Sequence, residues 1–252
     1  MAVGKPAAIS KGNIMITTVL FDLDGTLLPM ELDSFLENYF KLLISKLSAH
    51  GYEPQKVNDA LWEALMAMIA NDGSKTNEEV FWPVFNRECG KDARADIALF
   101  EEFYNNEFEG ARASCGFDSK AVETVAAVKA KGLRVVLATS PLYPAIATQQ
   151  RLRWAGFKPE DFELYTTYEN YHYCKPNPGY YQEVLRNLGL KPEECLMVGN
   201  DAIEDMVAAT LGIHVFLLPK WLVNRKNLDI SAYPQGDFDD LLRYIDTLTK
   251  KD

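Results

Sequence analysis

A run of β-branched, apolar and aromatic residues over 16–21 leads directly into Asp-Leu-Asp-Gly-Thr at 22–26. Such a run predicts a buried strand, and the alternation of side chains along an extended chain places Asp22 and Asp24 on the same side. An ionised carboxylate that is buried without a partner loses much of its hydration energy. Two carboxylates held side by side at the end of a buried strand therefore indicate a bound cation, with capping of the following turn as the simpler alternative.

The second half of the chain alternates between helix and strand. Helices are predicted over residues 119–131, 145–154, 178–188, 203–211 and 238–250, and strands over residues 133–139, 162–167, 195–199 and 213–218. Because parallel strands need helical crossovers between them, this alternation predicts an α/β fold with a doubly wound parallel sheet. In such sheets ligands bind at the carboxyl ends of the strands.

Residues 30–110 show a different pattern. Helical spacing of apolar side chains covers residues 31–49, 57–70, 78–87 and 93–108, and no strand pattern interrupts them. This segment predicts a small all-helical unit inserted into an α/β core that comprises residues 14–29 and 111–252.

Two later segments carry groups that suit a phosphate. Thr139 ends a predicted strand, where its hydroxyl, assisted by Ser140, can donate to a phosphate oxygen, although the pattern fits a Thr that merely ends a strand equally well. Lys175 precedes Pro176, which disfavours helical geometry at Lys175 and anchors it on a rigid turn. An anchored cation of this kind can bind phosphate and reduce repulsion between neighbouring carboxylates.

Two further acids follow the strand over 195–199. Asp201 lies at the sheet edge, and Asp205 falls one helical turn later on the same face. Asp201 is the first choice for a metal ligand and Asp205 a supporting or water-mediated one, while helix capping by Asp201 is the simpler alternative. Since the motifs contain no candidate His or Cys ligand, the donors are oxygen atoms, which favour Mg²⁺ over zinc.

In this order the motifs resemble those of the haloacid dehalogenase-like (HAD) superfamily of phosphohydrolases. The first is Asp-Leu-Asp-Gly-Thr at 22–26, the second is the strand ending in Thr139, the third is Lys175 followed by Pro176, and the fourth is residues 199–205. Asn200 departs from the common Gly-Asp of the fourth motif. Within the superfamily the chain resembles the phosphoglycolate phosphatase-like branch, where a type-1 helical cap lies between the first and second motifs.

The resemblance implies a HAD-like Rossmannoid fold and a Mg²⁺-dependent phosphatase that hydrolyses a small phosphomonoester. Asp22 would attack phosphorus to form an aspartyl-phosphate, and Asp24 would protonate the leaving alcohol and then deprotonate water. The implied metal site comprises Asp22, the Asp24 carbonyl, Asp201 and, in support, Asp205, and the implied phosphate-binding residues are Thr139, Ser140 and Lys175. The segment 30–110 would be the cap that closes over the site and selects the substrate.

Two alternatives stay open. A phosphomutase of the same superfamily would keep all four motifs, and a non-catalytic binding or regulatory module could use the same fold. A dehalogenase of the superfamily is disfavoured, because it has no use for an acid at Asp24 or for a metal ligand at Asp201.

Composition restricts the partners and the compartment. A net charge of −10 and a pI near 4.9 disfavour binding to nucleic acid or to an anionic membrane. The four cysteines are widely spaced without a Cys-x-x-Cys pair, and no apolar run approaches the roughly 18 residues of a transmembrane helix. We therefore expect a cytoplasmic monomer or homodimer with reduced cysteines, whose partner is a small phosphorylated molecule.

Overall fold

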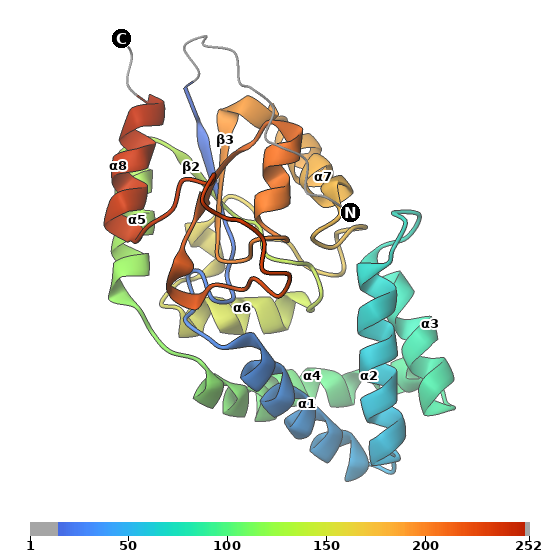
Figure 1. Ribbon diagram of the computed structural model, residues 1–252. Helices are drawn as coiled ribbons and strands as arrows, with labels where there is room; N and C mark the ends of the chain where they lie inside the picture. Colours follow the sequence, from blue (N-terminus) through green and yellow to red (C-terminus); the bar gives the residue numbers. More distant parts are fainter. Residues whose placement is uncertain (1–14, 250–252) are drawn as a thin grey trace.

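A parallel four-stranded sheet forms the centre of the molecule. The computed structural model describes residues 15–249, so that residue 14 and residues 250–252 of the predicted core lie outside it. The strands are β1 (Thr18–Phe21), β2 (Arg134–Leu137), β3 (Cys195–Gly199) and β4 (His214–Leu217). Their order is β2-β1-β3-β4, so that β1 has a parallel neighbour on each side (Figure 1). The predicted α/β fold with a parallel sheet is confirmed.

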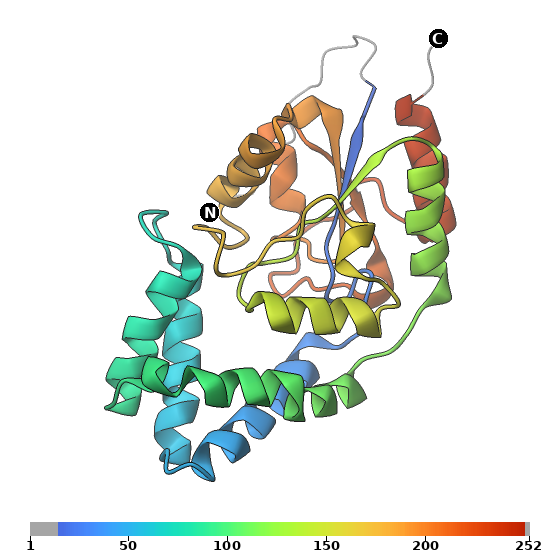
Figure 2. The same ribbon diagram turned by 180° about the vertical axis from the view of Figure 1, so that it is seen from behind.

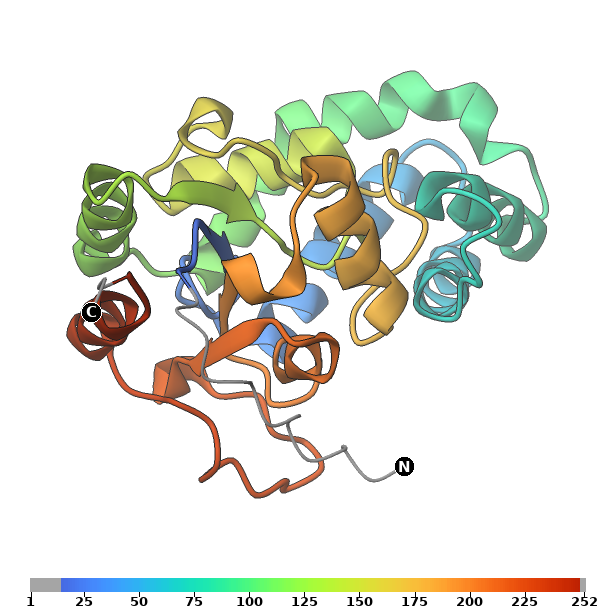
Figure 3. The ribbon, with the colours of Figure 1, turned by 90° about the horizontal axis from the view of Figure 1, so that it is seen from above.

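Helices cover both faces of this sheet. The helices α5 (Ser119–Ala130) and α8 (Phe238–Thr249) lie on one face, and α7 (Pro178–Leu188) and the 3-10 helix η5 (Met206–Leu211) lie on the other (Figure 3). Phe21 joins the hydrophobic cluster of α5 and α8, whereas Leu20 joins that of α7. Because both faces are covered, the strands are almost continuous apolar runs.

The helices of the insert lie together beyond the carboxyl ends of the strands, and α6 (Ala145–Trp154) lies between them and the sheet (Figures 1 and 2). They are α1 (Leu32–Ser48), α2 (Pro54–Ile69), α3 (Asn77–Cys89) and α4 (Ile97–Asn105), with the 3-10 helices η1 (Ala93–Asp96) before α4 and η2 (Glu107–Ser114) after it. Met30 and Cys115 form an antiparallel bridge at the two ends of this helical segment, because η2 continues past the predicted boundary at residue 110 to Ser114. No helix within residues 15–249 has both the length and the apolar composition needed to span a bilayer.

Two predicted elements of the core are wrong in kind. Residues 162–167 form no regular strand, because Tyr165 makes only a single parallel bridge with Leu137 of β2. Residues 203–211 form no α-helix: they begin as hydrogen-bonded turns and continue as the 3-10 helix η5. The side chain of Asp201 accepts from the N–H groups of Ile203 and Glu204, which holds the chain in turns at this point.

The predicted helix over 93–108 is divided into η1, α4 and the start of η2. Asn106 interrupts it, because its φ of −124° and ψ of −76° lie outside the helical region. The apolar spacing is nevertheless kept across the interruption, and Phe100, Phe103 and Phe108 are all buried.

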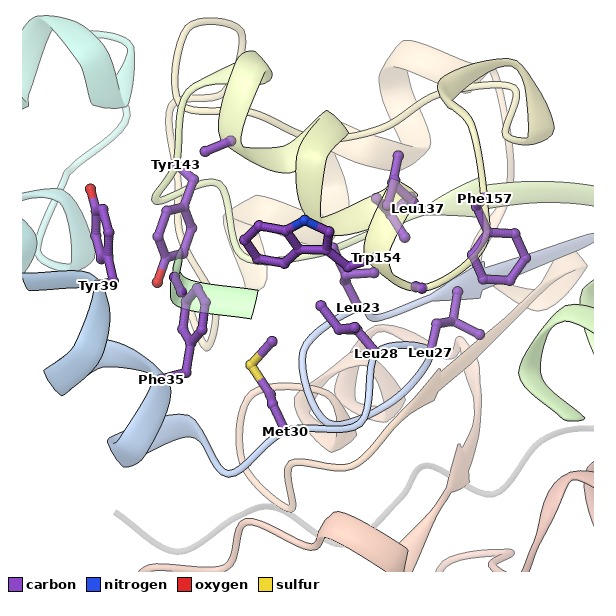
Figure 4. Close-up of a cluster of buried hydrophobic side chains, with 14 of the residues drawn as sticks. Leu23, Leu27, Leu28, Met30, Phe35, Tyr39, Leu137, Tyr143, Trp154 and Phe157 are labelled. Atoms are coloured by element: carbon purple, nitrogen blue, oxygen red, sulfur yellow. The ribbon is translucent and has the colours of Figure 1, made fainter. Parts of the chain in front are cut away.

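One hydrophobic core runs from the sheet into the insert. Figure 4 shows Phe35 and Tyr39 of α1 beside Tyr143, with Trp154 of α6 in the same cluster. Phe108 of η2 joins them, with its ring centroid 5.1 Å from that of Trp154 and 5.5 Å from that of Tyr39. The insert is therefore held against the rest of the chain by shared aromatic packing as well as by its two connections.

Replacing Phe108 by Ala should remove the ring that joins the insert to α6. Because Phe108 is fully buried, we expect the free energy of unfolding to fall by about 3–5 kcal/mol, measured by urea denaturation with circular dichroism. Met66→Ala is the matched control, since Met66 is 56% exposed and its loss should cost less than about 0.5 kcal/mol. A similar small cost for both variants would contradict a shared core.

Candidate active site

A cavity of about 370 Å³ opens at the carboxyl ends of the strands, between the sheet and the helical insert. Its acidic lining comprises Asp22, Asp24, Asp201, Glu204 and Asp205. The insert contributes Met30 and apolar side chains of α1 and α2, namely Leu32, Leu36, Leu65 and Ile69. A volume of this order suits a small ligand. The acids singled out in the sequence are thus brought together at one edge of the sheet.

Asp22, Lys175 and Asp205 form a buried ion cluster beside this cavity. Lys175 Nζ donates to Oδ1 of Asp22 at 2.9 Å and to Oδ1 of Asp205 at 2.7 Å, and the lysine side chain is 1% exposed. Burial, reinforced by Asp205 and Asp24 and opposed by Lys175, raises the pKa of Asp22 to about 7. Burial lowers the pKa of Lys175, but Asp205 and Asp22 outweigh burial and raise it well above its ordinary value. Lys175 is therefore a charged partner shared by two acids.

The turn after β1 is fixed by Gly25 and Asn200. Asp22 is the first residue beyond β1, and its N–H donates to the carbonyl of Val198 at 2.9 Å. Gly25 has a φ of +80°, and a Cβ at this position would lie 2.3 Å from the Asn200 side chain. Thr26 Oγ1 donates to Asn200 Oδ1 at 2.9 Å. Asn200, which departs from the usual fourth motif, thereby ties that motif to the first.

Asp201 and Asp205 are held by the backbone around them. Oδ1 of Asp201 accepts from the N–H groups of Ile203 at 2.6 Å and Glu204 at 2.8 Å, so it caps the turns that follow it, and no α-helix begins there for it to cap. Asp205 accepts the N–H of Asp201 with Oδ2 at 2.9 Å and binds Lys175 with Oδ1. Both oxygens of Asp205 are engaged, an arrangement that suits support of the site better than direct contact with a metal.

Thr139 and Ser140 border the cavity just beyond β2. The carbonyl of Thr139 accepts hydrogen bonds from the hydroxyls of Thr166 and Tyr180, the latter at 2.9 Å, which fixes the backbone at this point. Among residues 15–249, the buried hydroxyl of Ser140 has no hydrogen-bond partner. It is a donor that an oxygen atom of a ligand can satisfy.

Asp24 is paired with Arg151, a residue that the four motifs do not include. Oδ2 of Asp24 accepts from Nη1 of Arg151 in an ion pair, and Arg151 is completely buried. The guanidinium carbon lies 4.0 Å from the centre of the Tyr143 ring. The sequence offers one indication of Arg151: it falls on the buried face of a predicted helix, one turn after Ala147 and Thr148. A charge on such a face needs a buried partner.

The donors around the cavity fit a hard cation. Asp22 and Asp201 border it together, and their carboxylate oxygens are hard donors of the kind that Mg²⁺ prefers. Within the described part of the chain, no three His, Cys, Asp or Glu side chains are grouped closely enough to enclose a metal ion by themselves. Mg²⁺ does not require such a group, since one or two carboxylates, water and a substrate phosphate commonly complete its shell.

The chain belongs to the haloacid dehalogenase-like hydrolase family, whose model matches residues 16–211. Among its relatives is the pyrophosphatase PpaX of Bacillus cereus, 28% identical over 191 residues that cover 74% of this chain and 75% of PpaX. The putative phosphatase YhcW of Bacillus subtilis is 25% identical over 207 residues that cover 81% of this chain and 84% of YhcW. The chain is thus a member of a hydrolase family, with relatives that are named phosphatases.

Solved structures establish the HAD fold over nearly the whole chain. A HAD phosphatase from Thermococcus onnurineus has a TM-score of 0.60 at 17% identity and covers 93% of this chain and 100% of its own. A predicted phosphoglycolate phosphatase from Haemophilus somnus has a TM-score of 0.54 at 20% identity and covers 93% of this chain and 99% of its own. At these identities the likeness shows the fold alone.

Replacing Lys175 by Met keeps most of the side-chain volume and removes its charge. Asp22 and Asp205 are then left without their cation, and breaking a buried ion pair typically costs about 3–5 kcal/mol. We expect urea denaturation to show a loss of this size in the free energy of unfolding. The control is Lys220→Met, because Lys220 is 70% exposed, pairs with Asp118 at the surface and should contribute at most about 1 kcal/mol. Equal effects of the two variants would contradict the importance of the buried cluster.

Glu204 should make the stability of the metal-free protein depend on pH. Burial raises the pKa of Glu204 from 4.5 to about 8; the negative charge of Asp201 also raises it, and the positive charge of Lys175 lowers it. The folded chain therefore keeps a proton that the unfolded chain has lost, and this stabilisation, complete below about pH 4.5, disappears as the pH rises through about 8.

The variant Glu204→Gln cannot lose this proton. In the presence of EDTA, we expect its melting temperature to be similar to that of the wild type near pH 5 and higher than that of the wild type near pH 9. Thermal denaturation across this range measures the difference. A difference that stays constant with pH would show that Glu204 titrates normally.

Proposed function

We propose that this protein is a Mg²⁺-dependent phosphatase that hydrolyses a small phosphomonoester through an aspartyl-phosphate on Asp22. The observation that carries the proposal is the buried contact of Asp22 with Lys175, 2.9 Å long, beside a cavity that also exposes Asp24 and Asp201. The names of PpaX, a pyrophosphatase, and of YhcW, a putative phosphatase, support the class of reaction.

Asp22 is suited to act as the nucleophile. A carboxylate attacks phosphorus in its ionised form, and it does so best when it is partly desolvated and fixed in place. Burial supplies the desolvation, and the contact with Lys175 favours the ionised form and fixes one carboxylate oxygen. Mg²⁺, held by Asp22, Asp201 and the backbone carbonyl of Asp24, would supply charge neutralisation between the carboxylate and the phosphate.

Asp24 is suited to move the proton that each half of the reaction requires. In the first half a bond forms between Asp22 and phosphorus, the ester P–O bond breaks, and Asp24 gives its proton to the leaving oxygen. In the second half a water oxygen bonds to phosphorus and loses a proton to Asp24, and the bond from Asp22 to phosphorus breaks. Inorganic phosphate is released and Asp24 regains its proton.

Thr139 and Ser140 are proposed to hold the phosphate oxygens. Both border the cavity, and the hydroxyl of Ser140 is buried without a partner in the described part of the chain, so a phosphate oxygen would satisfy it. Lys175 contacts both Asp22 and Asp205, so its positive charge would stabilise the phosphate and also reduce the repulsion between the substrate and Asp205.

We propose that residues 30–110 form the cap domain and that the segments on either side form the core domain. The cavity supports this division, because its acids and hydroxyls come from segments that follow the strands, whereas α1 and α2 contribute only apolar side chains to its wall. Leu36, Leu65 and Ile69 would then contact the organic part of the substrate, while the core binds its phosphate. The wall favours a substrate whose organic part is compact and partly apolar.

Phosphate release from a panel of small phosphomonoesters and pyrophosphate, with Mg²⁺ or with EDTA, tests the proposed function. We expect release only with Mg²⁺, and a loss of at least about 10³-fold in Asp22→Asn with little change in the melting temperature, because Lys175 keeps Asp205 as its buried partner. Asp59→Asn is the matched control: Asp59 is exposed on α2, and this variant should retain full activity.

Three outcomes would count against the proposal. Undiminished release in EDTA would contradict the metal requirement, and substantial release by Asp22→Asn would remove Asp22 as the nucleophile. A phosphorylated protein that accumulates while no inorganic phosphate is released would favour a phosphomutase.

A further inference from the structure

We propose that Arg151 is a positioning residue for the proton transfer: it fixes Oδ2 of Asp24, so that Oδ1 is the oxygen that exchanges the proton. This inference rests on the proposed phosphatase function and adds to it a residue outside the four motifs. Arg151 acts through Asp24, since it does not border the cavity in which the substrate would bind.

The burial of Arg151 requires a specific role. Its side chain has no exposed surface, and a guanidinium without a partner would be strongly destabilising in such a place. Its only ion-pair partner among residues 15–249 is Asp24. Nη2 also donates a long hydrogen bond of 3.4 Å to Thr148 and the guanidinium lies over the Tyr143 ring, while the buried Nε has no hydrogen-bond partner in the described part of the chain. Asp24 is therefore the group that accounts for a charge at this position of α6.

The two oxygens of Asp24 are in different situations. Oδ2 is engaged by Arg151, whereas Oδ1 is buried and has no hydrogen-bond partner in the described part of the chain. A carboxylic acid can accept a hydrogen bond with one oxygen and donate from the other. With Oδ2 held by the guanidinium, Oδ1 is left to give its proton to the leaving oxygen as the ester P–O bond breaks, and to take one from water afterwards.

Tyr143 connects this pair to the insert. Its ring covers the guanidinium of Arg151 at 4.0 Å, and its centroid lies 5.7 Å from that of Tyr39 and 6.4 Å from that of Phe35, both on α1 (Figure 4). Tyr143 also borders the cavity. The orientation of Asp24 therefore depends, through Arg151 and Tyr143, on how α1 is seated against the core.

The dependence of the rate on the leaving group tests this role. An alkyl phosphate releases an alkoxide that needs a proton, whereas p-nitrophenyl phosphate releases a stable anion that does not. We expect Arg151→Met to lower kcat/KM for an alkyl phosphate by about 10²-fold and for p-nitrophenyl phosphate by less than about fivefold. The ratio kcat/KM is used because it reports the first, irreversible transfer and not the later hydrolysis of the aspartyl-phosphate.

Arg151→Lys is the conservative variant and the safeguard against misfolding. It keeps a cation that can donate to Oδ2 of Asp24, so we expect it to fold and to recover at least about tenfold of the loss with the alkyl phosphate, while still losing more with that substrate than with p-nitrophenyl phosphate. In either variant, equal losses with the two substrates would overturn the positioning role. A wild type that hydrolyses neither substrate would overturn the proposed function itself, and this inference with it.

Discussion

The buried cluster of Asp22, Lys175 and Asp205 is the interaction on which the rest of the site depends. Its three members come from the residue after β1, the segment before α7 and the residue before η5, so it can form only if the strands end at one edge in the observed order. Charges buried in this way tolerate little displacement, because each must keep its partner. The close approach extends to the backbone: a Cβ on Gly199 would lie 2.0 Å from Oδ2 of Asp205, so this strand must end in glycine.

The alternation of side chains after β1 places Asp22 and Asp24 near each other, and each forms an ion pair with a different basic residue. Lys175 binds Asp22 and Arg151 binds Asp24, so the repulsion that the sequence indicates between the two acids is already offset by the protein. Because each acid has its own cation, nucleophilic attack and proton transfer are assigned to two separate ion pairs. The oxygen atom next to Lys175 belongs to the proposed nucleophile, and the carboxylate next to Arg151 belongs to the proposed acid and base.

The sequence predicts well what depends on local pattern. The apolar run before Asp22 and the alternation of helices and strands are sufficient for the parallel α/β fold, because burial on both faces leaves a clear periodic signal. It fails where a side chain competes for backbone N–H groups and where a contact joins residues far apart in the sequence. The turns after Asp201 replace a helix because its side-chain oxygen takes the N–H groups of Ile203 and Glu204. The pairing of Arg151 with Asp24 joins residues 127 positions apart, and Arg151 lies in none of the four motifs.

The most direct test of the proposed mechanism is to identify the group that becomes phosphorylated. A substrate labelled on its phosphate would be mixed with excess protein, the reaction stopped in acid within its first turnover, and the labelled peptide located by mass spectrometry. If Asp22 is the nucleophile, the peptide that contains Asp22 will carry the label, hydroxylamine will remove it as expected of an acyl phosphate, and Asp22→Asn will carry none. Turnover without a labelled protein, or label at another residue, would contradict this mechanism.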